Sequence, residues 1–528
     1  MLQGRPTVIC PCRSRHCAMS WPLSRAVGTE RTVTYWGHLT GQINKKSRKA
    51  IALVGVALAT ACGDRRGDLA AALARMRAGC VVVVLDAAAA GHFGAYGYDR
   101  GTTPNIDAFA AQGIVFTRTY SQGPGTIISV PSYFSGLYPQ TIARWREVGE
   151  GAHPLALLAP GPGIAKSAPL QKAELAARPR FLAEAFRTAG FRTAGFSENP
   201  WVSPPFSLDA GFEHFVELDP VAGGLASSHQ VVDHALTWLG SNRDARFFVY
   251  LQLMRPHDPY LPPPSIAERF RPRSYGGSLR PDSSTLTAID RGRRAIGPMD
   301  QEFIVSQYDA NLFYGDELFG ELIRGLRTLG LFDRTVLIVM ADHGEAFGEH
   351  GRFLHSSTVY EEMIRVPLIL RLPPSVAPRP RRVSVPVALL DLFPTLGYLF
   401  SLPGEAVTGA EGLSLAPLIE NPNAAWPRTV IFAQRYTSVA AIEPEYKYIA
   451  EMSAAPGAPP EREELYFLPT DPGERRNIVA LHPERVRAMR ESVAGFIGGK
   501  ALPRDGGAAA ESITSDKRRQ LRALGYLQ

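Results

Sequence analysis

Residues 81–86, with the sequence VVVVLD, decide the fold class, because a continuous run of apolar and mostly β-branched residues here ends in a carboxylate. Such a run is typical of a strand that is buried on both faces of a sheet. The same pattern returns at residues 336–343, VLIVMADH, and a third apolar run at 247–251, FFVYL, precedes His257. The sequence therefore predicts three buried strands, each followed by residues that can carry chemistry.

Helical patterns separate these strands. Residues 180–186 and 304–326 place apolar side chains three and four positions apart, as amphipathic helices do. Because strands and helices alternate, we expect an α/β fold, with a mostly parallel sheet sandwiched by helices. In such sheets, ligands bind beyond the carboxyl ends of the strands. Asp86, Asp342 and His343 all fall at those ends.

The apolar stretches become shorter from about residue 440, at 446–449 and 464–468. This change predicts a small C-terminal α+β subdomain that carries a hairpin and a last helix. We therefore expect a catalytic domain over residues 80–435 and a C-terminal subdomain with the final helix over 436–528.

The positive charge of the chain is concentrated near its start. The 528 residues are 45% hydrophobic and 20% charged, which is typical of a globular protein and excludes collagen-like and wholly disordered chains. The net charge is +7, but residues 1–66 alone carry 11 Lys and Arg against Glu30 and Asp64. The rest of the chain is slightly acidic, so we expect no nucleic-acid partner.

All five cysteines lie within the first 80 residues, at positions 10, 12, 17, 62 and 80. This distribution excludes a disulfide framework in the rest of the chain. It also excludes a cysteine nucleophile there, which leaves Ser, Thr, Lys or a carboxylate.

Residues 45–62 resemble an export signal. A basic segment, KKSRK, precedes a short apolar run and small residues that end at Cys62, and the run is too short for a comfortable membrane span. The ending LATAC resembles a bacterial lipoprotein cleavage site, and the alternative is a plain signal peptide or an uncleaved apolar helix. We expect an exported bacterial protein, periplasmic or anchored in the outer membrane through Cys62, that contacts a membrane only through a lipid anchor or an uncleaved signal. Residues 1–44 are a leader of doubtful reality, which we interpret as the product of a start codon assigned too early.

Asp86, Asp342 and His343 offer two carboxylates and one imidazole from two strand ends, a plausible donor set for one divalent cation. An isolated Asp after a strand is also a common helix cap or turn residue. The choice between a metal ligand and a structural residue therefore depends on the neighbouring sequence. One imidazole with two carboxylates suits zinc first, then manganese, and calcium less well because its sites are usually all oxygen.

From about residue 80 the chain resembles the sulfatase branch of the alkaline-phosphatase superfamily over nearly its whole length. The matching stretches are 84–86, 96–98, 103–107, 113–116, 135–139, 341–345, 348–351, 360–362, 365–369, 391–395, 412–415, 465–466, 471–474 with Asn477, and the tail 521–527. The resemblance implies an exported, metal-dependent hydrolase of sulfuric or phosphoric esters.

Two registers are possible for the nucleophile. Residues 129–132, SVPS, match the first four positions of the motif C/S-x-P-x-R whose first residue becomes formylglycine, but the fifth position is Tyr133. The family nucleophile lies ten residues before the Gly of a T-G-x-x-P element, and counting back from Gly136 gives Thr126. Threonine cannot become formylglycine. We favour Thr126 over Ser129.

The resemblance implies a mechanism in which Thr126 is both nucleophile and metal ligand. Coordination to a divalent cation lowers the pKa of a hydroxyl, so the ligand set would be Asp86, Thr126, Asp342 and His343. In-line attack would give a covalent Thr ester, which is then hydrolysed or passed to an acceptor. His257 and His355 match histidines that bind the transferred group or protonate the leaving group.

The chain also departs from the sulfatase pattern. The family motif D-D-x-R-x-D is reduced to Asp86 followed by four alanines, and the arginine that supports formylglycine would fall at Val130. Two alternatives therefore stay open, namely a phosphodiesterase or phosphoethanolamine-type transferase, and a catalytically inactive binding member of the same fold. The substrate expected is a small-molecule, glycan or lipid ester, and the sequence predicts no organic cofactor.

Overall fold

The computed structural model describes residues 68–142, 180–453, 458–498 and 514–524. All of these belong to one compact unit, Arg65–Gln528. The predicted leader at 1–44 and the predicted signal at 45–62 lie outside the described residues.

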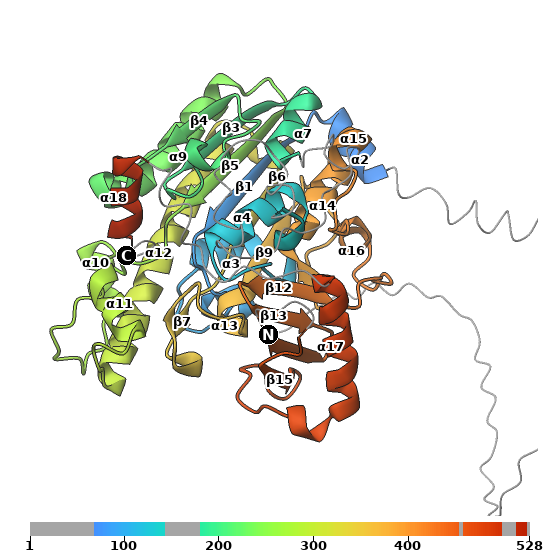
Figure 1. The fold of residues 1–528 in the computed structure, drawn as a ribbon. Helices are drawn as coiled ribbons and strands as arrows, with labels where there is room; N and C mark the ends of the chain where they lie inside the picture. The colour runs from blue at the N-terminus through green and yellow to red at the C-terminus, as the bar shows by residue number, and fades with distance from the viewer. Residues whose placement is uncertain (1–67, 143–179, 454–457, 499–513, 525–528) are drawn as a thin grey trace, which may run out of the picture. The chain divides into compact units, whose positions relative to one another are not determined.

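A mixed, mostly parallel sheet forms the centre of this unit (Figure 1). Its strands follow the order β10-β2-β9-β6-β1-β5-β3-β4, with β11 paired to β2. Every neighbouring pair is parallel except the two pairs made by β9, with β6 and with β2. The strands are β1 (Gly79–Leu85), β2 (Ile114–Tyr120), β3 (Arg192–Ser197), β4 (His214–Glu217), β5 (Phe247–Leu253), β6 (Thr335–Ala341), β9 (Arg365–Arg371), β10 (Arg381–Val383) and β11 (Val387–Ala388).

The three apolar runs of the sequence are the three central strands. Every residue of β1, β5 and β6 is buried, which explains why these strands show no alternation of polar and apolar residues. β1 pairs in parallel with β5 on one side and with β6 on the other. The predicted α/β fold with a mostly parallel sheet is confirmed.

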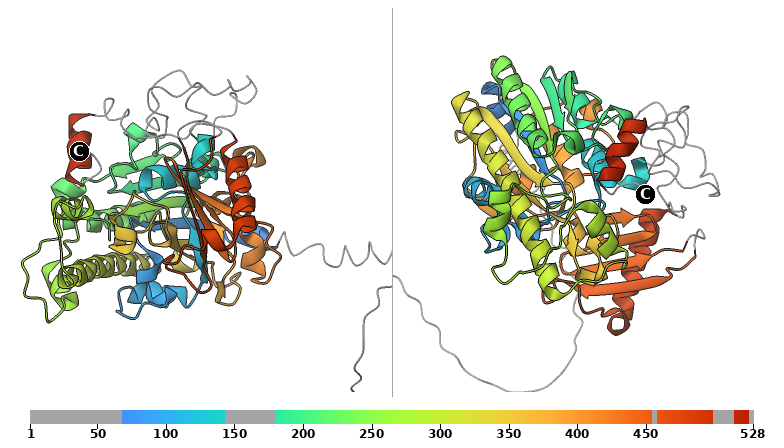
Figure 2. Two further views of the ribbon diagram at one scale, coloured as in Figure 1. Left: turned by 60° about the horizontal axis from the view of Figure 1, so that its bottom comes forward. Right: turned by 90° about the vertical axis from the view of Figure 1, so that its left-hand side faces the viewer.

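Helices cover both faces of the sheet (Figure 2). On one face, Tyr133 of α4 (Thr126–Ser135) shares a 2.7 Å hydrogen bond with Tyr250 of β5, and Phe186 of α7 (Leu182–Thr188) stacks on Phe248. α14 (Leu392–Leu399) and α2 (Asp68–Arg75) lie beside these helices. The opposite face carries α3 (Pro104–Ala110), α9 (Leu225–Ser241) and the long α12 (Pro298–Thr328). Further helices of the described residues are α8 (Pro220–Gly223), α10 (Pro264–Phe270), α11 (Ser283–Asp290), α13 (Glu361–Ile364), α15 (Gly404–Val407), α16 (Ala416–Glu420) and α18 (Ser515–Ala523).

The C-terminal part is a separate antiparallel sheet with one helix packed on it. The sheet follows the order β12 (Ile431–Arg435), β13 (Ser438–Ile442), β14 (Tyr446–Glu451) and β15 (Arg462–Phe467). Figure 1 shows α17 (Pro483–Ile497) alongside these strands, and it contacts β13 and β14. This arrangement fits the small C-terminal α+β subdomain that the short apolar stretches predict.

A buried lysine joins the C-terminal sheet to the larger sheet region. The Nζ atom of Lys447, on β14, lies 2.9 Å from Glu474 Oε1 and 3.3 Å from Glu361 Oε1 at the start of α13. The backbone N–H of Glu361 donates to Glu474 Oε2 at 2.6 Å. Burial would lower the pKa of Lys447, but the two carboxylates outweigh burial and raise it. The ammonium group therefore stays charged and compensates both carboxylates.

We expect Lys447→Met to lower the free energy of unfolding by about 3–5 kcal/mol, because two buried carboxylates lose their cation. The double variant Lys447→Met/Glu474→Gln should recover part of that loss, since only one uncompensated charge then remains. Urea denaturation followed by circular dichroism measures both.

The control for this experiment is Arg487→Met, which breaks an exposed ion pair with Glu484 whose side chains are 65% and 80% exposed. Exposed pairs contribute little to stability. The role assigned to Lys447 would be wrong if Lys447→Met cost no more stability than this control.

Candidate functional site

Three of the predicted donors meet at the carboxyl ends of two neighbouring strands. Asp86 follows β1, Asp342 and His343 follow β6, and the parallel register pairs Leu85 with Ala341 directly before them. Each residue offers one ligand atom, and these atoms lie within 4.8 Å of one another. All three side chains are fully buried.

Thr126 reaches the same cluster from a third element. It is the first residue of α4, and its Oγ1 donates to Asp342 Oδ2 at 2.9 Å and lies 3.3 Å from His343 Nε2. The preceding Gly125 packs closely against the loop that carries His355, because a Cβ there would lie 2.4 Å from Ser356 Oγ. This close approach positions the start of α4 at the strand ends.

Ser129, the alternative nucleophile, lies one helical turn further along α4. Its hydroxyl donates to the backbone carbonyl of Asp342 at 2.5 Å. Of the two candidates, Thr126 therefore contacts the carboxylate and imidazole groups, whereas Ser129 contacts main chain. This geometry supports the preference for Thr126, whose role stays a prediction.

Charge interactions within the cluster shift its pKa values in opposite directions. Burial alone would raise the pKa of Asp86, but the hydrogen bond to His343 and the charges of His257 and His343 lower it to about 2. Burial raises the pKa of Asp342, and the negative charge of Asp86 adds to this, so that it reaches about 6. Burial would lower the pKa of His343, but Asp342 and Asp86 outweigh burial and raise it to about 9. A cation, either a proton on His343 or a metal ion, is therefore favoured between the two carboxylates.

The donor set fits a divalent metal ion. Oδ1 of Asp86 is buried, and its contact with His343 Nε2, at 3.5 Å, is too long for a good hydrogen bond. A buried polar atom that is poorly satisfied is costly. His343 Nδ1 lies 2.9 Å from the carbonyl of Gly344, to which it can donate, which leaves Nε2 directed at the carboxylates. Two carboxylates, one imidazole and one hydroxyl make a mixed nitrogen and oxygen set of the kind that zinc accepts.

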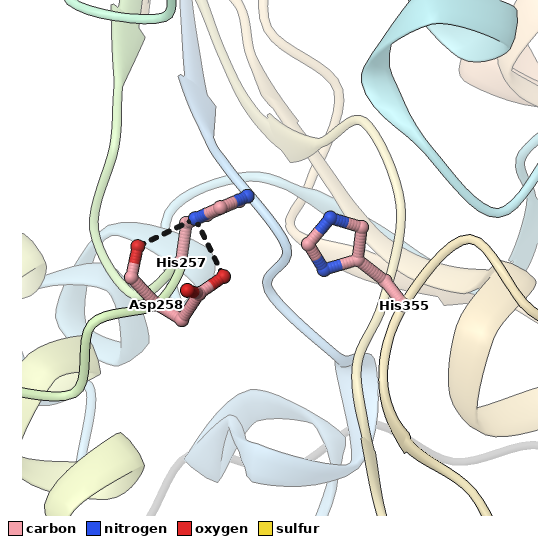
Figure 3. Close-up of side chains that lie close together, drawn as sticks. All are labelled: His257, Asp258 and His355. Carbon is pink, nitrogen blue, oxygen red and sulfur yellow. Dashed lines mark hydrogen bonds and ion pairs between the residues drawn. The ribbon is translucent and has the colours of Figure 1, made fainter. Parts of the chain in front are cut away.

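His257 and His355 form a second group together with Asp258 (Figure 3). With Asp258, they offer ligand atoms that lie within 4.8 Å of one another. The ring centroids of His257 and His355 are 4.7 Å apart, and those of His355 and His343 are 4.5 Å apart. All the predicted site residues are thus brought together in one place.

The two histidines of the second group differ in charge. His257 Nδ1 lies 2.7 Å from the Asp258 carbonyl and 3.2 Å from its carboxylate. Burial would lower the pKa of His257, but the charges of Asp258 and Asp86 raise it. Burial lowers the pKa of His355, and the neighbouring positive histidines lower it further. His257 therefore favours the protonated form and His355 the neutral form.

The loop around His355 has a strained backbone. Leu354 and Ser356, on either side of His355, have φ angles of 60° and 63°, in the left-handed region that residues with a Cβ rarely adopt. The short strands β7 (Ala346–Phe347) and β8 (Phe353–Leu354) pair directly before this point. Strain of this kind persists where the surrounding structure imposes it, often at functional sites.

Two amide side chains that were not predicted from the sequence also contact this cluster. Asn199 Nδ2 donates to Asp86 Oδ2 and lies 3.2 Å from Thr126 Oγ1, and Gln252 Nε2 donates to Asp86 Oδ2 at 2.8 Å. Asn199 follows β3 by two residues, and Gln252 is the one amide residue in β5. A glutamine within an otherwise apolar strand was a signal that the sequence offered for Gln252.

The fold is shared with solved enzymes of low sequence identity. A phosphonate monoester hydrolase of Agrobacterium radiobacter matches with a TM-score of 0.60 and 19% identity, covering 80% of this chain and 95% of that one. A protein solved in complex with its substrate D-glucosamine-2-N,6-O-disulfate matches with a TM-score of 0.60 and 18% identity, covering 79% of this chain and 98% of that one.

Curated relatives include arylsulfatase K of Xenopus laevis, which is 27% identical over 304 residues. The match covers 50% of this chain and 55% of the relative. The chain thus spans about half the length of the curated relatives it matches.

These relatives correct the predicted location. They are vertebrate arylsulfatases, from Xenopus laevis and Homo sapiens among others, which conflicts with a bacterial periplasmic or outer-membrane lipoprotein. The prediction rested on a short apolar run with small residues before Cys62, and such a run also occurs in apolar segments that are not cleaved. In the described part of the chain, no helix combines the length and apolar character that crossing a bilayer requires.

The family model for sulfatases matches residues 80–402, which is more than half of the chain. The matched region contains Asp86, Thr126, Asp342 and His343, together with His257 and His355. The chain therefore belongs to the sulfatase family.

Proposed function

We propose that this protein is a metal-dependent hydrolase of sulfate esters in which Thr126 is the nucleophile. One observation carries the proposal: the Thr126 hydroxyl lies at the N-terminus of α4, 2.9 Å from Asp342 Oδ2 and 3.3 Å from His343 Nε2. A hydroxyl held between a carboxylate and an imidazole is positioned for activation as a nucleophile.

Family membership supports sulfate esters as the substrate class. Curated relatives are named arylsulfatases, and one protein of the same fold has a disulfated glucosamine as its substrate. A sulfated small molecule or glycan is therefore the first substrate class to test.

The proposed metal ligands are Asp86, Thr126, Asp342 and His343, with zinc as first choice. When bound, the metal supplies positive charge that lowers the pKa of the coordinated hydroxyl and stabilises sulfate oxygens. The amides of Asn199 and Gln252 both donate hydrogen bonds to Oδ2 of Asp86. Both amides leave the charge of the donor set unchanged.

The proposed reaction is an in-line displacement at sulfur. Thr126 Oγ1 forms a bond to sulfur, its proton leaves along the hydrogen bond to Asp342, and the ester S–O bond breaks. The backbone N–H groups at the start of α4 favour the negative oxygens of the transferred group. His257, which favours the protonated form, donates a proton to the leaving alcohol. Water then attacks the sulfur of the Thr sulfate ester and gives up a proton to His257, the bond between Thr126 Oγ1 and sulfur breaks, sulfate leaves, and the proton held by Asp342 returns to Oγ1 and restores the hydroxyl.

A phosphoric ester is the second candidate substrate, for hydrolysis or for transfer of the phosphoethanolamine type. The observation that favours it is the residue type at position 126, because threonine cannot be converted to the formylglycine of most sulfatases. The phosphonate monoester hydrolase of the same fold supports testing this class. A non-catalytic binding protein is the remaining alternative, suggested by the four alanines after Asp86.

We expect Thr126→Ala to reduce turnover of 4-nitrophenyl sulfate or phosphate by at least about 100-fold, because the nucleophile is lost. Thr126→Ser should keep measurable turnover, since it keeps a hydroxyl at the same place. Steady-state kinetics with both esters measure this, and the ratio of the two rates gives the preference between sulfate and phosphate.

Ser129→Ala is the matched control from the same helix, and it should retain a measurable fraction of the wild-type rate. If Ser129→Ala were inactive while Thr126→Ala kept its activity, the assigned register of the nucleophile would be wrong.

We expect about one equivalent of zinc or manganese per chain in the purified protein, because the donor set is preorganised by the fold. Dialysis against a chelator should abolish turnover, and added zinc should restore it. Elemental analysis and activity assays measure both. Less than about half an equivalent of metal, together with no turnover of either nitrophenyl ester, would support the binding protein instead.

A further inference from the structure

We propose that a pocket beside the candidate site binds a second acidic group, a carboxylate or a sulfate, of the saccharide whose sulfate ester lies at Thr126. This inference rests on the proposed function and specifies its substrate class. We refer to the pocket as the arginine pocket. It has a volume of about 200 Å³, and its polar lining includes Arg352, Ser357, Thr358, Arg435, Glu451 and Arg462.

The lining of the arginine pocket has an excess of positive charge. Three arginines and one acidic residue, Glu451, line the pocket, and Arg462 Nε also lies 3.4 Å from Oε1 of the neighbouring Glu464. The Glu451 carboxylate already accepts hydrogen bonds from the hydroxyls of Thr437 and Ser438. Guanidinium groups bind carboxylates and sulfates through paired N–H groups. The pocket therefore favours an anion over a neutral or cationic group.

The arginine pocket adjoins the candidate site through the loop that carries His355. Ser357 and Thr358 line the pocket, and an extended chain advances about 3.3–3.6 Å per residue, so their Cα atoms lie within about 11 Å of that of His355. The His355 ring in turn lies 4.5 Å, between centroids, from that of His343. Three residues of one loop thus join the candidate site to the arginine pocket, and the proposed ligand carries its two acidic groups on one saccharide or on adjacent saccharide units.

A second connection runs through Ser356. Its backbone N–H donates to the carbonyl of Pro124 at 2.7 Å, directly before the turn that begins α4. Its own carbonyl accepts a hydrogen bond from Arg435 Nε of β12. One wall of the arginine pocket is thus tied to the backbone that positions Thr126.

The volume of the pocket limits what it can hold. Sites for drug-sized ligands usually have volumes of about 300–1,000 Å³, so a cavity of about 200 Å³ suits one acidic substituent with part of a sugar ring. The lining comes both from the loop before α13 and from all four strands, β12 to β15, of the C-terminal sheet. The C-terminal sheet therefore contributes directly to substrate selection.

The test compares matched saccharides by isothermal titration calorimetry on the Thr126→Ala protein, in which ligands persist. One pair is D-glucosamine-6-O-sulfate and D-glucosamine-2-N,6-O-disulfate, and the other is a sulfated hexose and the corresponding sulfated hexuronate. In at least one pair we expect the ligand with the second acidic group to bind at least about 10-fold more tightly, as a charge-assisted hydrogen bond implies. The two pairs distinguish a sulfate from a carboxylate.

The substitutions Arg352→Ala and Arg462→Ala, added to the Thr126→Ala protein, should abolish this preference in the same titration. The control Arg487→Ala removes an arginine outside the pocket and should leave the preference unchanged. Thermal unfolding of each variant shows whether it is folded, and Arg435→Lys provides a second pocket variant that keeps the charge but weakens paired recognition. If both members of each pair bound equally, or if the preference survived the double substitution, the inference would be overturned.

Turnover of 4-nitrophenyl sulfate by the wild-type protein separates this inference from the proposed function. Normal turnover without a preference in binding rejects the arginine pocket as a subsite and leaves the hydrolase intact. A clear preference without turnover keeps the subsite and rejects the hydrolase. If the protein showed neither a preference in binding nor turnover, both the arginine pocket as a subsite and the hydrolase would be rejected.

Discussion

The repulsion between two buried carboxylates, Asp86 and Asp342, determines much of the structure around the candidate site. They follow neighbouring parallel strands, so the register of β1 and β6 fixes them side by side. Both are fully buried, and two like charges in such a place require a compensating cation. His343 supplies one as a protonated imidazole, and the hydroxyl and amide donors around the pair reduce the cost further. The same arrangement is what a divalent metal ion requires.

Much of this arrangement could be predicted from the sequence, since buried parallel strands are continuous apolar runs and their ends are easily read. Asp86, Asp342 and His343 follow such runs directly. Thr126 was predicted only through the family resemblance, because nothing in its local sequence distinguishes it from Ser129. Asn199 was not predicted, since an asparagine after a strand is ordinary in a turn and only the pairing of β3 with β5 brings it near Asp86.

The arginine pocket could not be predicted for a related reason. Its arginines come from a loop near residue 352 and from strands near residues 435 and 462, which lie far apart in the sequence. Isolated arginines between apolar residues are typical of any solvated strand face. Only the docking of the C-terminal sheet, with Lys447 buried between Glu361 and Glu474, brings them around one cavity. The predicted leader and signal lie outside the described residues, and their assignment to a bacterial lipoprotein conflicts with the vertebrate relatives.

Ala87 and Ala89, which stand where the family motif has its second Asp and its Arg, keep a structural role. Ala87 has a φ angle of 57°, and its backbone N–H donates to Asp342 Oδ1 at 3.3 Å. The Tyr308 hydroxyl bonds to the carbonyl of Ala87 and accepts from the N–H of Ala89. Main-chain groups and the amides of Asn199 and Gln252 thus surround Asp86 and Asp342, which gives a site with fewer negative charges. Mass spectrometry of the protein quenched during turnover of 4-nitrophenyl sulfate decides whether Thr126 is the nucleophile. We expect one added sulfuryl group on Thr126. A sulfuryl group on Ser129, or turnover without any covalent intermediate, would show that Thr126 does not have this role.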